Sequence, residues 1–397
     1  MELYILDNQL RREVVIDRFE SLIWKEKFNS LGEFKLDLDS TPVTRNLFRY
    51  GDHLALNRSN RVMVVENIEK TNSSDGRSLI NISGRSLESI LEQRVVYNPD
   101  AIDISKHTPV ITFNTPLTLT GTAGSVIRQI FDRVCITNTL VPEDNLPFYD
   151  VGNFYPVDTL PEPDEALVIE IGMGTAYSAI ENIAQSYNLG FRLVRHPVTS
   201  LLYFNVYAGN DRTSTQSELS AVVFSPDLDN LTESSEFGSI ESYYNVVYVL
   251  NKKNGLQKVY ADGIDPTISG FDRRILYVDA TTLDLELTDP NYLAVVNQVG
   301  REALVKSRPV ALMDGEIPQA TIYKYEVEYG LGDLIEIRNE DGITNRMRVT
   351  EQIFIEDSEG ERSYPTLELE YMVTPGSWND WSFNTIWNNA LGTWDDL

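Results

Sequence analysis

The chain has 397 residues, of which 42% are hydrophobic and 10% are aromatic. These values are typical of a globular protein with room for two or three domains, and they exclude wholesale disorder. The net charge of −27 excludes a protein that holds nucleic acid by neutralising its phosphates.

The negative charge is concentrated in two long segments. Residues 134–191 contain nine Asp and Glu residues and no Lys or Arg. Residues 213–251 contain six acids and again no base. Solubility is one explanation of this pattern. The other is a surface that faces a polyanion without binding it, and we expect these segments to supply part of such a surface.

The chain is not expected to be exported through a signal peptide or anchored in a membrane. Its first ten residues, MELYILDNQL, carry an acid at position 2 and no apolar run, and no stretch is long enough to span a bilayer. The single cysteine, Cys135, excludes internal disulfides and Cys-x-x-Cys metal sites. We expect it to pack in the core.

The first 84 residues predict a β-meander within a first domain of residues 1–93. Apolar and polar residues alternate in EVVIDRF, SLIWKEKF, EFKLDLD, DHLALN, RVMVVENIEK and RSLINIS, and SSDG between the last two predicts a hairpin. The following stretch, NISGRSLESILEQR (residues 81–94), predicts a strand that ends at a Gly84 turn. A short helix capped by Ser86 is expected after this turn.

Residues 94–234 predict an α+β module with acidic loops. TAGSVIRQIFDRV is expected to be a helix, and so is TAYSAIENIAQSYN. Their predicted inward residues are Val126, Ile127, Ile130, Phe131 and Val134 in the first and Ala176, Ile180, Ile183, Ala184 and Tyr187 in the second. GFRLVRH and LLYFNVYAG are expected to be strands.

Residues 235–375 return to a β pattern, with a helix expected over 289–306. Asp289 is the predicted N-cap of this helix and Pro290 its first residue. The strands are predicted in SYYNVVYVL, LQKVYADG, TIYKYEVEY, DLIEIRN, NRMRVTEQIFIED and PTLELEYMV.

An internal repeat relates the first and last of these regions. Gly51-Asp52 corresponds to Gly332-Asp333, each opening a short strand. Further along, Glu66 and Ile68 are aligned with Glu351 and Ile353, and Asp75-Gly76 with Glu359-Gly360. The repeat predicts two similar β-barrels with the α+β module between them.

Four stretches, in this order, resemble the tail-hub proteins of tailed bacteriophages, and most closely the Gp37-like group of siphophage tail proteins. They are WKEKFNSLGEFKL (Trp24–Leu36), VYAGNDRT (Val206–Thr213), VVFSPDLDNL (Val222–Leu231) and YGLGDLIEI (Tyr329–Ile337). The resemblance is spread over residues 1–373. It implies a homotrimeric ring at the distal end of the tail tube, with two tube-like barrels per subunit, so that six barrels meet a sixfold tube.

The fold prediction is therefore mainly β with an α+β insertion: two similar β-barrel hub domains, residues 1–93 and 235–375, and an α+β middle module, residues 94–234. Residues 376–397 form a separate segment of different composition. It holds four of the five tryptophans of the chain. We expect it to dock another tail protein, with partner-binding residues Trp378, Trp381, Phe383, Trp387 and Trp394. Packing of these rings on the chain's own barrel and binding of a sugar are the alternatives.

No catalytic, metal or cofactor site is expected. Glu88 stands where a nucleophile elbow at Ser86 requires glycine, and the three histidines of the chain lie in no partner motif. An anion site assisted by Arg85 is the alternative use of this stretch. The scattered histidines and single cysteine do not provide the spacing of a zinc site. Paired carboxylates for glycoside cleavage stay open, because the sequence gives no distances between acids.

The predicted function is that of a structural phage tail-tip protein. It would close the distal end of the tail tube, adapt the tube to a trimeric tip and dock a downstream tip or fibre protein through its C-terminus. Genomic DNA would pass without specific binding. A receptor- or carbohydrate-binding tail protein is the first alternative, and a tail-borne cell-wall hydrolase is the second.

Overall fold

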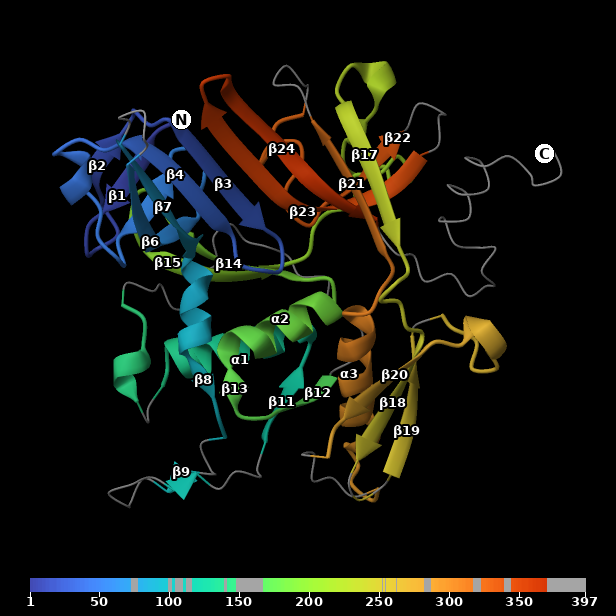
Figure 1. Ribbon diagram of the computed structural model, residues 1–397. Helices are drawn as coiled ribbons and strands as arrows, with labels where there is room; N and C mark the ends of the chain where they lie inside the picture. Colours follow the sequence, from blue (N-terminus) through green and yellow to red (C-terminus); the bar gives the residue numbers. More distant parts are fainter. Residues whose placement is uncertain are drawn as a thin grey trace.

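The protein is described from a computed structural model, which covers residues 1–72, 78–98, 102–103, 110–111, 116–138, 141–147, 167–251, 253, 255–261, 263–281, 287–316, 323–338 and 344–369. Of residues 102–103, 110–111, 232–238, 310–316 and 369, only the backbone is described. A large sheet forms one end of the molecule, and the helices with a small sheet form the other (Figure 1).

The first β unit contains all six strands expected in residues 1–93, together with a short strand at the start. In chain order they are β1 (Leu3–Leu6), β2 (Arg12–Ile16), β3 (Ser21–Lys27), β4 (Glu33–Asp39), β5 (His53–Leu56), β6 (Val62–Asn72) and β7 (Ser78–Ser86). The spatial order is β3-β4-β7-β6-β5-β1-β2. Alternate residues of β3 and β4 are buried, including Trp24, Phe34 and Leu36, as the sequence pattern predicts.

The second β unit consists of β16 (Val223–Phe224), β17 (Thr232–Ser239), β21 (Val310–Glu316), β22 (Leu334–Arg338), β23 (Thr344–Asp357) and β24 (Gly360–Leu369). Its spatial order is β17-β21-β24-β23-β22-β16. The strand predicted in TIYKYEVEY is wrong for its described part, residues 323–329, which forms a turn with an isolated bridge between Tyr325 and Tyr329. Glu326 has a φ of +62°, which a strand residue does not adopt.

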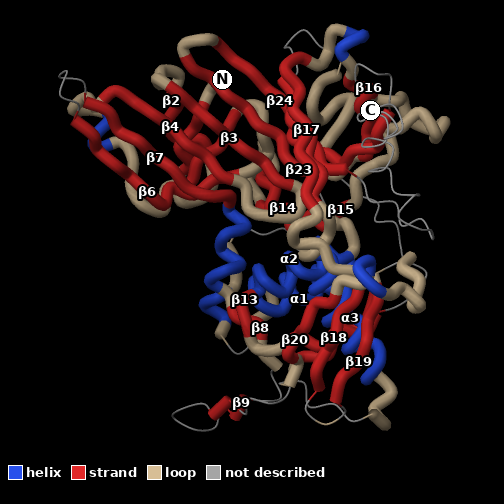
Figure 2. The backbone as a smooth tube through the Cα atoms, turned by 45° about the vertical axis from the view of Figure 1, so that its right-hand side comes forward, coloured by secondary structure: helices blue, strands red, loops and turns tan. Residues whose placement is uncertain are grey.

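The two β units are joined into one sheet by the antiparallel pairing of β23 with β3. Figure 2 shows the strands of both units running side by side through this junction. The mainly β prediction is confirmed. The strand pairings of the described residues do not show the two closed barrels that were expected. The reason is that β3, the strand at one end of the first unit, pairs with the second unit and not with β2.

The predicted internal repeat is present around two glycine-aspartate turns. Gly51 has a φ of +85° and Gly332 a φ of +88°, a backbone conformation that glycine adopts readily. The N–H of Gly51 donates to the carbonyl of Val65 on β6, and the N–H of Gly332 donates to the carbonyl of Val349 on β23, both at 2.8 Å. Each valine N–H donates back at 2.9 Å to the carbonyl of the aspartate after the glycine. A β-bulge follows each valine, so the two turns are structurally equivalent.

Beyond the bulge the repeat is shifted by one residue from the sequence alignment. Glu66 corresponds to Thr350 and Ile68 to Gln352, and not to Glu351 and Ile353 as expected. The chain between the turn and the bulge is longer in the second unit, so only the hydrogen-bond register locates the equivalent residues. Asp75-Gly76 lies outside the described residues.

The stretch from Asn81 to Arg94 differs from its prediction in two respects. Gly84 is not a turn but lies inside β7, where an added Cβ would be 1.8 Å from the Val64 carbonyl oxygen. Ser86 precedes the 3-10 helix η2 (Leu87–Gln93) without capping it. Its hydroxyl instead accepts a hydrogen bond from the N–H of Gly32 at 3.0 Å. Ser86 therefore joins the end of β7 to the residue that precedes β4.

The middle module packs two helices on a β-hairpin. These are α1 (Ala123–Cys135), α2 (Ala176–Ser186), β14 (Gly190–Arg195) and β15 (Leu202–Tyr207), with the short pairs β11 (Leu117–Gly121) and β12 (Leu167–Ile171), β8 (Val95–Val96) and β13 (Gly174–Thr175), and β9 (Ile102–Asp103) and β10 (Val110–Ile111). All predicted inward residues of both helices are buried except Tyr187, which is half-buried. Phe131 stacks on Phe204 with ring centroids 4.0 Å apart. Cys135 is a core residue, and burial raises the pKa of its thiol to about 12.

A separate lobe packs α3 (Tyr292–Val305) on the three strands β18 (Val246–Asn251), β19 (Gly255–Tyr260) and β20 (Ile275–Asp279). The helix begins after Asn291, not at Pro290, because the Asp289 carboxylate accepts the N–H of Asn291 at 2.8 Å and forms a turn. The short 3-10 helices are η1 (Thr44–Asn46), η4 (Pro142–Asp144), η5 (Pro226–Leu228) and η6 (Gly270–Asp272). The domain boundary at residue 235 stays a prediction.

The two equivalent glycines provide a matched stability test. Gly51→Ala is expected to cost about 1 kcal/mol, from backbone strain alone, since nothing lies within 4 Å of the added Cβ. Gly332→Ala adds a clash, because its Cβ would lie 2.3 Å from the Phe28 ring, and should cost about 3 kcal/mol. Urea denaturation of the two variants measures the difference. Equal losses would show that the crowding around Gly332 is not felt.

Candidate functional site

The five aromatic residues predicted to bind a partner, Trp378, Trp381, Phe383, Trp387 and Trp394, lie outside the described residues. Their docking role stays a prediction. The four stretches on which the family resemblance depends are described, and they meet in one place. One hydrophobic cluster takes residues from all of them: Phe28, Tyr207, Val222, Phe224, Leu231, Tyr329, Leu331, Ile335 and Ile337.

Asp333 is the polar anchor of this four-stretch junction. Its Oδ1 accepts the N–H of Asn210 at 2.7 Å, and its Oδ2 accepts Arg212 Nε at 2.8 Å. The Asp333 side chain is only 4% exposed. Since a buried carboxylate is stable only with such partners, Asp333 fixes the segment after β15 against the start of β22.

The backbone of the segment after β15 lies very close to the backbone just before β22. An added Cβ on Gly209 would lie 1.8 Å from backbone atoms of Gly332, so only glycine fits there. The N–H of Leu334 donates to the Asn210 carbonyl at 2.9 Å, and the N–H of Arg212 donates to the Leu334 carbonyl at 2.8 Å. Residues 210–212 therefore run along β22 as an extra strand-like segment.

A buried ion pair joins the first β unit to the middle module. Arg61 Nη1 donates to Glu88 Oε1 at 2.6 Å, and both side chains are almost fully buried. Glu88 Oε1 also accepts the N–H of Leu193 on β14 at 2.7 Å. Burial opposes the charge of Arg61, but the Glu88 carboxylate outweighs it and raises the pKa of the guanidinium. The Arg61 guanidinium is thus held in its charged form inside the protein.

Glu26 joins the two β units in a similar way. It accepts Trp24 Nε1 at 3.3 Å and the Ser59 hydroxyl from the first unit, and the Tyr325 hydroxyl at 3.0 Å from the second. Burial, together with the nearby Glu26 charge, raises the pKa of Tyr325 well above its usual value. Tyr325 therefore stays a protonated donor. None of these buried polar links was predicted from the sequence, where Glu26, Arg61 and Glu88 look like surface residues.

The side chains of Ser86 and Arg85 are both engaged by partners within the protein. The Ser86 side chain is buried and its hydroxyl is engaged with Gly32. Arg85, the residue expected to assist an anion, is held by Glu66 and Glu92 at 2.8 Å each. Two carboxylates therefore already engage the guanidinium that the alternative anion site would use.

The described residues also show neither a metal centre nor a membrane span. Among them, His, Cys, Asp and Glu side chains form no group of three or more arranged to hold a metal ion. In the same part of the chain, no helix has both the length and the apolarity needed to cross a membrane.

Removing the charge of Glu88 tests the buried ion pair. Glu88→Gln removes the carboxylate that is hydrogen-bonded to the buried Arg61 guanidinium, and we expect a loss of about 3–5 kcal/mol in the free energy of unfolding. The matched control is Glu33→Gln, which breaks the 3.0 Å pair with Lys25 on the surface. This control should cost less than about 1 kcal/mol. Similar losses in urea denaturation would contradict the assigned role of Glu88.

No curated protein matches the sequence significantly. Two tail proteins are among the solved structures that share its fold. A tail protein from Neisseria meningitidis MC58 has a TM-score of 0.52 and 13% sequence identity, over 96% of this chain and 98% of that one. The 43 kDa tail protein of prophage MuSo2 from Shewanella oneidensis has a TM-score of 0.52 and 14% identity, over 92% of this chain and 98% of that one.

At such low identities the two structures establish similarity of fold alone. The sequence itself carries the stronger finding. A family model described as Siphovirus ReqiPepy6 Gp37-like protein matches residues 2–366, which include all four stretches of the junction around Asp333. The chain therefore belongs to the Siphovirus ReqiPepy6 Gp37-like family of phage tail proteins.

Proposed function

We propose that the protein is a non-enzymatic hub subunit that closes the distal end of a phage tail tube as a homotrimer. In this role it adapts the tube to a trimeric tip, docks further tip proteins and leaves a path for DNA. The observation that carries the proposal is the pairing of β23 with β3, which joins two structurally equivalent β units edge to edge.

The same type of junction can be repeated between copies. In the described residues, β6 beyond Asn67 pairs on one side only, with β7, and β17 pairs only with β21. By the repeat, β6 is the equivalent of β23, and β17 is the equivalent of β3. Pairing β6 of one copy with β17 of the next would therefore continue the sheet. Three copies would then place six β units around a ring with a heterologous interface, which matches a sixfold tube.

Three basic residues of the sheet are paired with carboxylates, which supports passage of DNA without specific binding. Lys27, at the end of β3, pairs with Glu351 at 3.4 Å. Lys25 and Arg85 are also paired with carboxylates. Paired bases have little attraction left for phosphates. Carboxylates of residues 134–191 and 213–251 are proposed to supply part of the lumen wall. They would repel DNA weakly over a Debye length of about 8 Å.

Receptor or carbohydrate binding is the second candidate function, and one observation favours it. The sheet face of β18 and β20 that points away from α3 carries Tyr248 and Tyr277, and Tyr277 is 56% exposed. Arg273 lies over the Tyr248 ring, 5.9 Å from its centroid. Rigid aromatic faces of this kind suit sugars and protein partners alike.

The stoichiometry of the ring is the first test of this proposal. A reconstruction of assembled tails should show three copies of the chain in one ring at the distal end, because two units per copy are needed to match six tube subunits. Any other number of copies per ring would contradict the hub role. The purified chain alone is a weaker sample, since assembly can require the tube.

Deleting residues 376–397 tests the docking segment. The truncated chain should keep its melting temperature and enter tails, but the tails should lack their terminal component. Replacing Trp378, Trp381, Phe383, Trp387 and Trp394 by Ala in the full chain should have the same effect, because buried aromatic anchors dominate such contacts. If truncation unfolds the protein, the rings belong to its core. If complete tails assemble but no longer adsorb to cells, receptor binding is favoured.

A further inference from the structure

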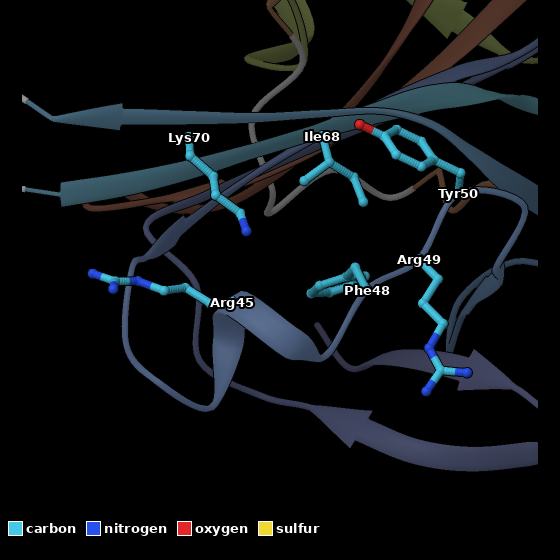
Figure 3. Close-up of a pocket in the computed structure, with 6 residues that line it drawn as sticks. All are labelled: Arg45, Phe48, Arg49, Tyr50, Ile68 and Lys70. Carbon is cyan, nitrogen blue, oxygen red and sulfur yellow. The ribbon is translucent and has the colours of Figure 1, made fainter.

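A pocket of about 520 Å³ opens at the outer end of the first β unit. Figure 3 shows its six lining residues, which come from η1, from the segment that follows it and from β6: Arg45, Phe48, Arg49, Tyr50, Ile68 and Lys70. Phe48 is buried and forms an apolar base, whereas Tyr50 is 72% exposed. The pocket therefore combines an apolar floor with a cationic rim.

Three of the six lining residues are basic, in a chain whose net charge is −27. Arg45 is oriented by the Ser40 hydroxyl, which accepts its Nε at 2.8 Å. Among the described residues, the side chains of Arg49 and Lys70 form no ion pair. A cluster of uncompensated cations of this kind attracts an acidic partner.

The second β unit contains the counterpart of this pocket, and there strand β3 of the same chain fills the space. Counting from the equivalent glycines and valines, Phe48 corresponds to Tyr329 and Lys70 to Phe354. Phe354 lies opposite Trp24 across the β23–β3 junction and packs in the core of the first unit. The pocket is thus the equivalent of the β23–β3 junction, but without a strand paired to it.

We propose that this pocket receives strand β17 of a second copy of the chain. This inference rests on the proposed ring, and it specifies the contact that closes it. The occupant is fixed by the repeat, because β17 is the equivalent of β3, the strand that fills the counterpart junction.

The register of the contact follows from three strand pairings. Gly84 and Leu367 are equivalent, since they lie opposite Val65 and Val349, the valines that precede the bulges. The next strand places Phe34 opposite Gly84 and Met313 opposite Leu367. The strand after that places Trp24 opposite Phe34 and Glu236 opposite Met313. Trp24 and Glu236 are therefore equivalent.

Within the chain, Trp24 lies opposite Phe354, which is the counterpart of Lys70. Since Glu236 is the equivalent of Trp24, Glu236 of the second copy would face Lys70. By the same count, Ser239 would face Asn67. The charges agree with this register. Glu233 and Glu236 are the only charged residues of β17, and the surrounding residues 213–251 contain no base. Two copies with a large net negative charge would repel each other elsewhere, so local attraction at this pocket would select the register.

Charge reversal in the full-length chain tests the proposal. Lys70→Glu and Glu236→Lys should each weaken self-association by roughly tenfold or more, and the double variant should return to within about threefold of the unmodified chain. Sedimentation of the purified chain and its incorporation into tails measure this effect. The control is Lys35→Glu, which places the same charge change on β4, away from both edges, and should change association little. Melting curves identify any variant that fails to fold.

A cysteine pair tests the register independently. Asn67→Cys with Ser239→Cys in one chain should form cross-linked oligomers on oxidation. Asn67→Cys with Ser235→Cys should not, because the second cysteine would lie roughly 13 Å along the strand. If trimers form but Lys70→Glu behaves like Lys35→Glu and the first pair does not cross-link, this inference is overturned and the ring stands. If the chain enters tails without forming any ring, both proposals fail.

Discussion

The antiparallel pairing of β23 with β3 is the interaction on which the arrangement of the rest of the structure depends. It runs from Glu351 opposite Lys27 to Glu356 opposite Leu22, and it merges two β units into one sheet. The hydrogen bond from Tyr325 to Glu26 and the packing of Phe354 against the first core reinforce it from one face. With the units fixed side by side, the junction around Asp333 and the Arg61–Glu88 pair can hold the middle module beneath them.

The repeat shows how one local structure serves two settings. Asp52 and Asp333 accept the N–H three residues earlier in the same way, at 2.8 and 2.9 Å. Only Asp333 also binds the segment after β15, since that segment passes the second unit and not the first. The strands β6 and β23 also differ beyond their bulges, according to what each of them pairs with. A buried phenylalanine fills the junction within the chain, whereas a lysine lies at the open edge, where a charged residue prevents uncontrolled pairing.

Local patterns in the sequence predicted the helices and most strands, because burial of one face leaves a period that can be read directly. Val126, Ile130 and Phe131 are examples. The sequence did not reveal that Gly84 lies within a strand or that Ser86 bonds Gly32, since both depend on neighbours far along the chain. The joining of the two β units and the buried Arg61–Glu88 pair were missed for the same reason. The repeat itself was visible, but its register required the positions of the bulges.

Amide hydrogen exchange along the two free edges tests the account most directly. In the isolated chain, fast exchange is expected for those amides of residues 67–72 and 232–239 whose N–H points to the unpaired side of the strand. In assembled tails they should slow by at least about tenfold, towards the rates of residues 22–27 at the internal junction, because both edges become paired. Unchanged exchange at these edges in tails that contain the protein would contradict a ring closed by the β6–β17 contact.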